Sequence, residues 1–218
     1  MDAIILNDVE VRALGALIEK DITTPEYYPL SLNALTNACN QKNNRDPVVD
    51  YGEQAVSRAV DSLRTKRLAF ALTGAESRVL KFGHKATDTL ALPRPELSVL
   101  CVLLLRGPQT LGEIRGRTGR MHEFADLAEV QAVLQTLASR PEPLVTVLPR
   151  QAGTKESRYA QLLGGAIATA AIADEAPAPE PVDPGADKIA KLEAEVAALR
   201  GEVASLQQQF AAFRKQFE

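Results

Sequence analysis

Apolar residues recur every three or four positions near the start of the chain, which predicts an amphipathic helix. The apolar stripe consists of Val11, Leu14, Leu17 and Ile18. Asn7, followed three residues later by Glu10, has the spacing of a capping box that begins this helix. Pro25 and Pro29 then interrupt the helical pattern.

Two further helices and a β-hairpin are predicted before residue 90. A short helix is expected from Ser31, and a third helix from Asp50, which is followed three residues later by Glu53. The apolar face of the third helix consists of Val56, Ala59, Val60 and Leu63. The pattern then changes to the alternation of a strand, with Leu68, Phe70 and Leu72. A turn at Gly74 and a returning strand over residues 78–82 complete the hairpin.

The same order of elements is predicted a second time, over residues 91–163. The matching helix-start signals are Pro95, Thr110 with Glu113, and Asp126 with Glu129. Strands are expected at residues 144–148 and 158–162. The tripeptide Glu-Ser-Arg introduces the returning strand in both copies, at residues 76–78 and 156–158.

Three helices followed by a β-hairpin are typical of a winged-helix domain, in which the second and third helices form a helix-turn-helix. The sequence therefore predicts a mainly α fold with small β elements (α+β), with tandem winged-helix domains at residues 1–90 and 91–163. Two generic α+β domains that share only their element order are the alternative. The matching helix caps and the repeated tripeptide favour winged helices.

The C-terminal part of the chain has a different composition. Residues 164–187 are rich in Gly, Ala, Pro and acidic residues and predict a linker. Residues 188–218 carry a strict 3–4 apolar repeat, which predicts a coiled coil that forms a homodimer. Its stripe consists of Ile189, Leu192, Val196, Leu199, Val203, Leu206, Phe210, Phe213 and Phe217. Antiparallel or trimeric pairing, a helix folded back on its own domains, and docking of another protein remain alternatives.

Composition excludes several classes of protein. Aromatic residues make up 5% of the chain and Trp is absent, which argues against a carbohydrate cleft and against aromatic platforms for single-stranded nucleic acid. The longest apolar run, residues 99–105, is too short to span a bilayer. The N-terminus lacks the basic region of a secretory signal, and the two cysteines form no CxxC pair. We expect a cytoplasmic protein with no membrane partner.

No motif for catalysis, cofactor binding or metal binding is present. The sequence contains no HExxH, GxSxG, Walker or GxGxxG motif. His84 and His122 are expected in loops, where a lone histidine is usually solvated. The sequence therefore predicts a protein that is not an enzyme and that has no catalytic residues, no metal site and no cofactor.

The distribution of charge permits a DNA partner without requiring one. The chain has a net charge of −3, and much of the acidity lies in residues 166–218, with five basic and nine acidic residues. The candidate contacts to double-stranded DNA are Gln54, Ser57, Arg58, Arg64, Arg78, Lys81, Arg115, Arg117 and Arg120. Lys42 and Arg45, in the loop before the third helix, add positive charge nearby. A solvated charged face is the alternative interpretation of these residues.

A protein-interaction scaffold is the alternative function, because winged helices also serve protein assembly and a fold alone does not define a function. The acidic C-terminal region supports this interpretation, as does the predicted third helix of the second copy, which has no cation before Arg140. Of the two functions we favour a regulatory DNA-binding dimer, in which the first copy contacts the bases.

Two long stretches are similar to a known family. Residues 35–47 (LTNACNQKNNRDP) and 106–118 (RGPQTLGEIRGRT) resemble the YceH-like family of uncharacterised bacterial proteins, and the similarity continues through residues 121–124 (MHEF). It covers about residues 4 to 163. The resemblance implies a tandem winged-helix fold and implies no activity or catalytic residue set.

Overall fold

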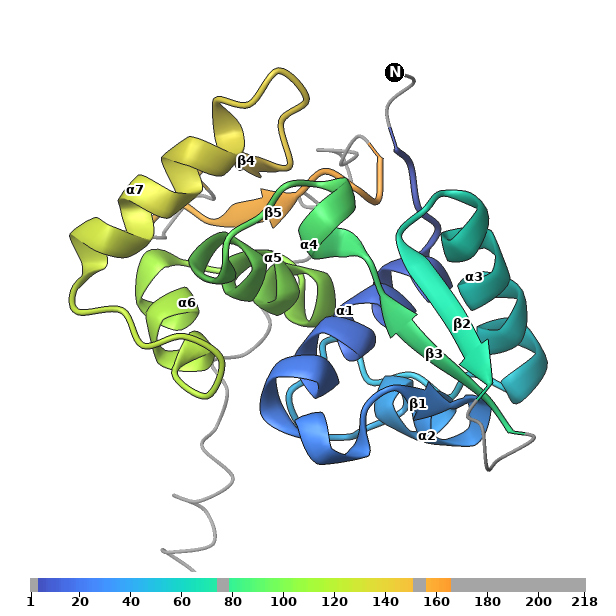
Figure 1. The fold of residues 1–218 in the computed structure, drawn as a ribbon. Coiled ribbons are helices and arrows are strands. Elements are labelled where there is room, and N and C mark those ends of the chain that lie inside the picture. Colours follow the sequence, from blue (N-terminus) through green and yellow to red (C-terminus); the bar gives the residue numbers. More distant parts are fainter. Residues whose placement is uncertain (1–3, 74–78, 151–155, 166–218) are drawn as a thin grey trace, which may run out of the picture. The chain divides into compact units, whose positions relative to one another are not determined.

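The structure, a computed structural model, describes residues 4–73, 79–150 and 156–165, and these belong to one unit (Figure 1). The candidate DNA contact Arg78 and the predicted coiled coil at residues 188–218 lie outside these ranges. So does the predicted linker, apart from its first two residues. The expected mixed α+β class is confirmed, with helices and small antiparallel sheets.

The first segment contains helices and a three-stranded sheet. Its elements are α1 (Asp8–Thr23), the 3-10 turn η1 (Pro25–Tyr27), β1 (Leu30–Ser31), α2 (Leu32–Cys39), α3 (Glu53–Thr65), β2 (Ala69–Thr73) and β3 (Leu80–His84). The sheet is antiparallel in the order β1-β3-β2. Leu30 lies opposite Phe82, and Phe70 lies opposite Gly83. The two-residue strand β1 was too short to predict from the sequence.

The second segment repeats this order with shorter strands. After the short connecting helix α4 (Ala86–Thr89), its elements are α5 (Arg94–Arg106), α6 (Leu111–Thr118), α7 (Leu127–Ala138), β4 (Val145–Val147) and β5 (Tyr159–Gln161). β4 and β5 form an antiparallel pair. Gln109, just before α6, makes an isolated antiparallel bridge to Tyr159 of β5. This bridge has the place in the second segment that β1 has in the first.

Side-chain caps begin several helices as the sequence predicts. In α1 the Asn7 Oδ1 accepts from the Glu10 amide at 3.0 Å, and the Glu10 carboxylate accepts from the Asn7 amide at 2.8 Å. Thr110 and Glu113 form the same reciprocal box at α6. The α7 cap is also confirmed, because Asp126 accepts from the backbone of its third helical residue at 2.9 Å. These caps satisfy amide donors that lack a partner within the helix.

The predicted start of the third helix at Asp50 is wrong. The N-cap of α3 is Gly52, which has no side chain to cap the helix, and Glu53 is the first helical residue. The reason is a contact from the preceding helix. Asn40 accepts from the Tyr51 amide at 2.8 Å and donates to the Tyr51 carbonyl at 2.9 Å. This pair of bonds uses the Tyr51 backbone and keeps it outside the helix.

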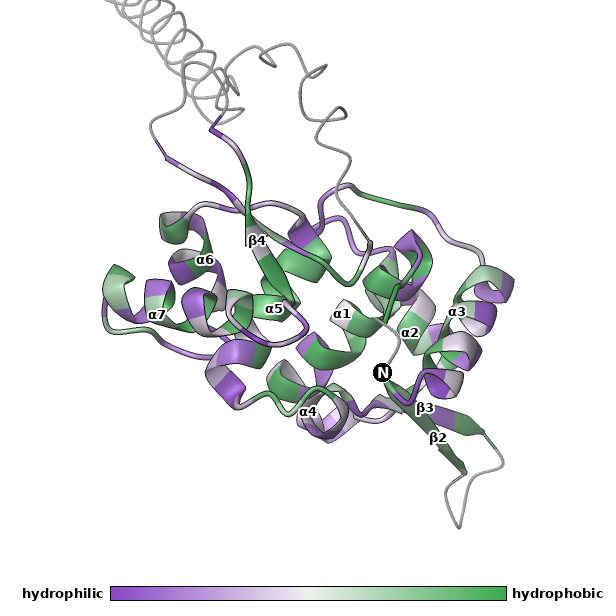
Figure 2. Ribbon diagram, turned by 90° about the horizontal axis from the view of Figure 1, so that it is seen from above, coloured by the Kyte–Doolittle hydropathy of each residue, from purple (hydrophilic) through white to green (hydrophobic). Residues whose placement is uncertain are grey.

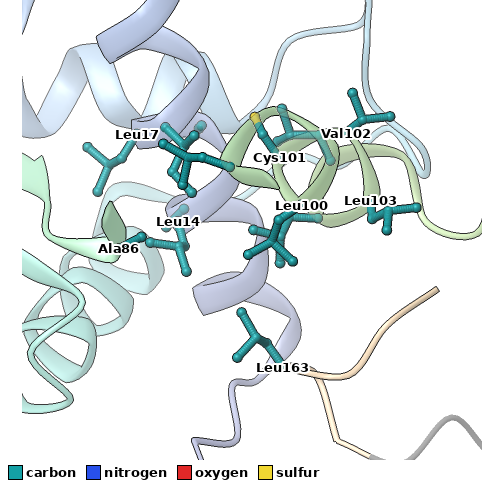
Figure 3. Close-up of a cluster of buried hydrophobic side chains, with 14 of the residues drawn as sticks. Leu14, Leu17, Ala86, Leu100, Cys101, Val102, Leu103 and Leu163 are labelled. Atoms are coloured by element: carbon teal, nitrogen blue, oxygen red, sulfur yellow. The ribbon is translucent and has the colours of Figure 1, made fainter. Parts of the chain in front are cut away.

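The core lies where α1 packs against α5. Leu14 and Leu17 of α1 and Leu100 and Cys101 of α5 are fully buried in one cluster (Figure 3). α2 and α3 contact α1, and α6 and α7 contact α5. α1 and α5 lie at the centre of the hydropathy view and are coloured largely as hydrophobic (Figure 2). The buried side chains of the two segments therefore form one continuous core.

Candidate nucleic-acid interface

Helix α3 has one buried face and one exposed face. Val56, Ala59, Val60 and Leu63 have 4% or less of their surface exposed. Gln54, Arg58 and Arg64 are exposed, and Ser57 is half-buried. The spacing of apolar residues thus correctly predicts which side of α3 packs on the protein. The candidate contacts on this helix lie on the side that the fold leaves open.

The two arginines of α3 differ in their partners. Arg64 forms an exposed ion pair with Asp61 at 2.8 Å, which offsets part of its charge. Within the described ranges, Arg58 makes no hydrogen bond or ion pair and stays available. Asp61 and Glu53 also place negative charge on this helix. Arg58 is therefore the freer cation of the pair.

Lys66, which follows α3, belongs to the fold. Its ammonium lies 2.6 Å from the buried Glu10 carboxylate of the α1 capping box. Burial raises the pKa of Glu10, but hydrogen bonds from Lys66, Ser62 and the Asn7 backbone outweigh it and lower the pKa. This ion pair fastens the end of α3 to the start of α1.

Within the described residues, the hairpin of the first segment contains one of the predicted DNA contacts. Lys81 lies on the central strand β3, half-buried, opposite Ser31 of β1 and Leu72 of β2. Leu72, Val79 and Leu80 are exposed near the end of this hairpin. The hairpin thus presents apolar side chains beside its cation.

The three arginine candidates of the second segment have different roles. Arg115 donates to the carbonyls of Phe124 at 3.3 Å and Ala125 at 2.8 Å, so it holds the loop between α6 and α7. Arg117 lies 3.7 Å from Glu113, one turn earlier on α6. Arg120 is exposed, and the described residues offer it no ion pair or hydrogen bond. Of the three, Arg120 is the cation without a partner among the described residues.

Helix α7 presents an outward face without basic residues. Its exposed side chains beyond the first turn are Gln131, Ala132, Gln135 and Thr136. Leu127 at its start and Val147 on β4 are 45% and 50% exposed. A pocket of about 340 Å³ lies at the start of α7, lined by Leu111, Gly112, Leu127, Arg150, Glu156, Ser157 and Tyr159. The third helices of the two segments therefore differ as the sequence predicts: the outward face of α3 carries arginines and that of α7 carries no basic residue.

The structure brings Arg117 and Arg120 close to the loop between α2 and α3. Together they line a groove that we call the basic groove, formed by two adjoining pockets of about 280 and 310 Å³. Its cations are Lys20, Lys42, Arg106, Arg117 and Arg120. Sequence reasoning missed Lys20 and Arg106, because their proximity to the others depends on the packing of α1, α5 and α6. The motif residues around Lys42 and Arg117 were the only signal available.

Arg45 lies inside the protein, unlike the surface cation expected in the sequence. Its guanidinium donates to both carboxylate oxygens of Glu19, at 2.6 and 3.2 Å, and to the carbonyl of Ala38. It also donates to Gln41 and to the Asn44 carbonyl. These bonds hold the α2–α3 loop in shape, so Arg45 does not face a ligand.

His84 is also buried, although the sequence predicts a solvated side chain. It ends β3, and its Nε2 lies 3.2 Å from Asp21 while its Nδ1 accepts from the Ala86 amide at 3.3 Å. His122 is half-buried and packs edge-on against Phe124. Among the described residues, no group of three or more His, Cys, Asp or Glu could hold a metal ion. In the same part of the chain, no helix has the length and apolarity to cross a membrane.

The chain belongs to the DUF480 family, a family of proteins of unknown function whose profile matches residues 6–154. UPF0502 proteins from Opitutus terrae and Pelobacter propionicus are each 58% identical to it, over 193 and 196 residues. These alignments cover 88% of this chain and 82% and 89% of those two proteins. A UPF0502 protein from Solibacter usitatus is 52% identical over 194 residues, which cover 88% of this chain and 91% of that protein. The expected membership of an uncharacterised bacterial family is thus confirmed.

Proposed function

We propose that residues 1–90 and 91–163 are two winged-helix domains and that the protein binds double-stranded DNA as a dimer. Support for the domain class comes from the element order of each segment. In both, a short extended piece before the second helix pairs with the last strand of the hairpin, at Leu30–Phe82 and at Gln109–Tyr159. A helix-turn-helix domain places its recognition helix in the major groove. That role falls to α3 in the first segment.

The observation that carries this proposal is the open face of α3. Gln54 and Arg58 lie one turn apart on this face, exposed to solvent, while the opposite face is buried in the core. Gln pairs with adenine and Arg with guanine in the major groove. Gln54 and Arg58 would read bases in this arrangement, and Lys81 on the hairpin would contact the backbone.

The first domain is the DNA reader in this proposal. The outward face of α7 offers Gln131 and Gln135 but no cation, and the positive charge of phosphate contacts dominates the affinity of DNA binders. One reading helix per chain gives modest affinity. A dimer formed through residues 188–218 would present two copies of α3 to one duplex, and the second contact would be intramolecular.

The test is a salt titration of binding to a random-sequence DNA duplex, followed by fluorescence anisotropy. We expect affinity to fall steeply with salt, by about 0.9 in log–log slope for each phosphate contact. Arg58→Ala combined with Arg64→Ala should abolish binding at moderate salt. Lys85→Ala, which removes an exposed cation between β3 and α4, is the control and should bind like the unaltered chain. Equal affinity of the double variant would remove α3 from the contact surface.

The dimer is tested by deletion of residues 188–218. Light scattering should report a monomer, and DNA affinity should fall because the second α3 no longer binds in the same complex. A dimer that persists after the deletion would place the interface elsewhere.

A protein-interaction scaffold is the second candidate, and the face of α7 favours it. Leu127, which lines a pocket, and Val147 on β4 are exposed apolar residues, and α7 has no cation on its outward face; these features suit a protein partner, although Arg150 and Glu156 also line the pocket. No duplex binding even at low salt would support this function over DNA binding. Leu127→Glu should then abolish capture of the partner, and Gln135→Glu, an exposed change on the same helix, should weaken it less.

A further inference from the structure

The basic groove lies where three helices end together. Lys20 is in the last turn of α1, Arg106 ends α5 and Arg117 is in the last turn of α6. The α2–α3 loop contributes Lys42, and Arg120 follows α6. The two pockets are contiguous, because they share Glu19, Thr23, Asn44 and Arg120. One wall of the groove comes from the first segment and the other from the second.

Cations at helix C-termini compensate the negative end of the helix dipole. The positive charge of the groove therefore has to be compared with the negative charge of the three helix ends. Each helix end carries about half a negative charge, and three ends together carry on the order of one and a half. Glu19 adds one carboxylate, which Arg45 binds at 2.6 Å and which also lies 3.7 Å from Lys20. The five lining cations therefore exceed the local negative charge, even though Arg117 also lies near Glu113.

Arg106 lies close to other cations and to two carboxylates. Burial lowers the pKa of Arg106, the neighbouring Arg117 and Arg45 lower it further, and Glu19 and Asp46 raise it. Its guanidinium is fixed by a hydrogen bond to the Asn44 side chain. Two of the other cations, Lys42 and Arg120, are exposed and have no hydrogen bond or ion pair in the described part of the chain. An anion in the groove would remove this repulsion and give those cations a partner.

The groove has a polar end and an apolar end. The polar pocket is lined by Gln41, Lys42 and Asn43 of the loop. The apolar pocket has a floor of Val102, Leu105 and Met121, each 7% exposed or less. Gly116 and Gly119 also line it, and a methyl group added at either would meet no atom within 4 Å. Pockets of a few hundred Å³ with an apolar lining and a few convergent polar groups are typical small-molecule sites.

We propose that the basic groove binds a small phosphorylated molecule with an apolar or aromatic part, of the nucleoside di- or triphosphate class. The phosphates lie between Lys42, Arg120 and Arg106, and the apolar part lies on Leu105 and Met121. Its two small pockets suit a compact ligand better than a duplex, whose phosphates are spaced along an extended backbone. This site is separate from the face of α3 and does not depend on DNA binding. Because its walls come from both segments, a bound ligand would tie the α2–α3 loop to α6.

The experiment is isothermal titration calorimetry of the full chain with ATP, ADP, pyrophosphate and adenosine, without magnesium. We expect ADP and ATP to bind more than tenfold more tightly than adenosine, and ADP more tightly than pyrophosphate. Lys42→Ala combined with Arg120→Ala should weaken ATP binding at least tenfold. Both side chains are exposed, and circular dichroism should show that this variant folds normally. Lys85→Ala removes an exposed cation outside the groove and should leave ATP affinity unchanged.

Three results would overturn the proposal. The first is an absence of nucleotide binding at millimolar concentration, and the second is equal ATP affinity in the double variant. The third is a double variant that loses affinity for duplex DNA but keeps its affinity for ATP, which would assign the groove to the DNA backbone. Failure of the α3 variants in DNA binding has no effect on these measurements, so the two proposals fail separately.

Discussion

Two cations three residues apart in the α2–α3 loop have opposite environments. The Arg45 side chain is fully buried, whereas Lys42 is exposed on the basic groove. The planar guanidinium accounts for the difference, because its five N–H donors can serve several acceptors at once. Arg45 binds Glu19, Ala38, Gln41 and Asn44. Arg12 does similar work nearby, donating to the carbonyls of Cys39 and Pro47.

Replacement of Arg45 should strongly destabilise the protein. Arg45→Met leaves the Glu19 carboxylate without its buried partner and the Ala38 carbonyl without a donor. Loss of one member of a buried ion pair costs about 3–5 kcal/mol. We expect a loss of about 3 kcal/mol in the free energy of unfolding, measured by urea denaturation. Lys42→Met, the exposed control, should change stability by less than about 0.5 kcal/mol. A small effect of Arg45→Met would mean that water replaces its hydrogen bonds.

His84 is a second buried polar residue with a defined role. Burial lowers the pKa of His84, and the nearby Asp21 carboxylate opposes this effect only in part. Because Nδ1 accepts from the Ala86 amide, the proton of the neutral ring lies on Nε2 and faces Asp21. A protonated ring would lose the acceptor at Nδ1. The fold therefore favours neutral His84.

The stability of the protein should fall in mildly acidic solution because of His84. The unfolded chain has a histidine pKa of about 6.5, above the value in the folded protein, so the unfolded state binds more protons. The stabilising contribution is present above that pH and is lost as pH falls through the lower folded pKa. We expect the urea midpoint of the unaltered chain to decrease between pH 7 and 5.5. His84→Gln should flatten this dependence, and parallel curves for the two proteins would refute the assignment.

At the scale of elements, helices α1 and α5 form the centre of the molecule. The sequence predicts one apolar stripe on α1, but Ala13, Gly15 and Ala16 are buried as well. α5 packs against α1 at Gly15, which is not part of that stripe. Small residues there permit a close approach, and the Cys101 thiol donates to the Gly15 carbonyl at 3.4 Å. A pattern of alanine and glycine gives only a weak apolar signal in the sequence.

Gly15→Ala should therefore destabilise the protein although alanine favours helix. A Cβ at position 15 would lie 2.8 and 2.9 Å from Leu105 and 3.1 Å from the Leu104 Cβ. Overpacking of a core costs about 1–3 kcal/mol, while the gain in helix propensity is about 1 kcal/mol. We expect a net loss of about 1 kcal/mol in thermal or urea unfolding. Gly116→Ala in α6, where a Cβ meets no atom within 4 Å, is the matched control and should stabilise the protein. A stabilising Gly15→Ala would show that α5 moves aside readily.

At the scale of the whole molecule, the two segments share their core and their ends. The buried clusters of α1 and α5 are continuous (Figure 3). The Leu6 amide, before α1, donates to the Leu163 carbonyl, after β5, at 2.7 Å. The Asp46 amide of the first segment donates to the Leu105 carbonyl of the second at 2.9 Å. The sequence repeat thus folds into a pair of segments that bury each other.

These shared contacts should make the segments unfold together. We expect hydrogen exchange in increasing urea to give one midpoint for peptides from α3 and from α7. The reason is that separation of the segments would expose the apolar surface between α1 and α5 to water. Residues 1–90 alone should be much less stable than the same residues in the full chain. Two separate midpoints would indicate that each segment is stable by itself.

The sequence by itself determined the local features of this protein. The helix caps at Asn7, Thr110 and Asp126, the buried face of α3 and the two hairpins depend on neighbouring residues, whose spacing is visible in the sequence. Hydrogen bonds between residues three apart and a periodicity of 3.6 residues require no knowledge of distant parts of the chain.

The tertiary structure alone decided where charges and polar groups go. Arg45 binds Glu19, 26 residues away in the sequence, and His84 contacts Asp21, 63 residues away. The start of α3 at Gly52 depends on the bond between Tyr51 and Asn40, 11 residues away. The basic groove likewise requires α1, α5 and α6 to end at one place. The residues next to a cation in the sequence do not show whether its side chain is buried or exposed. Its environment is set by which distant carbonyls, carboxylates and helix ends the packed core brings beside it.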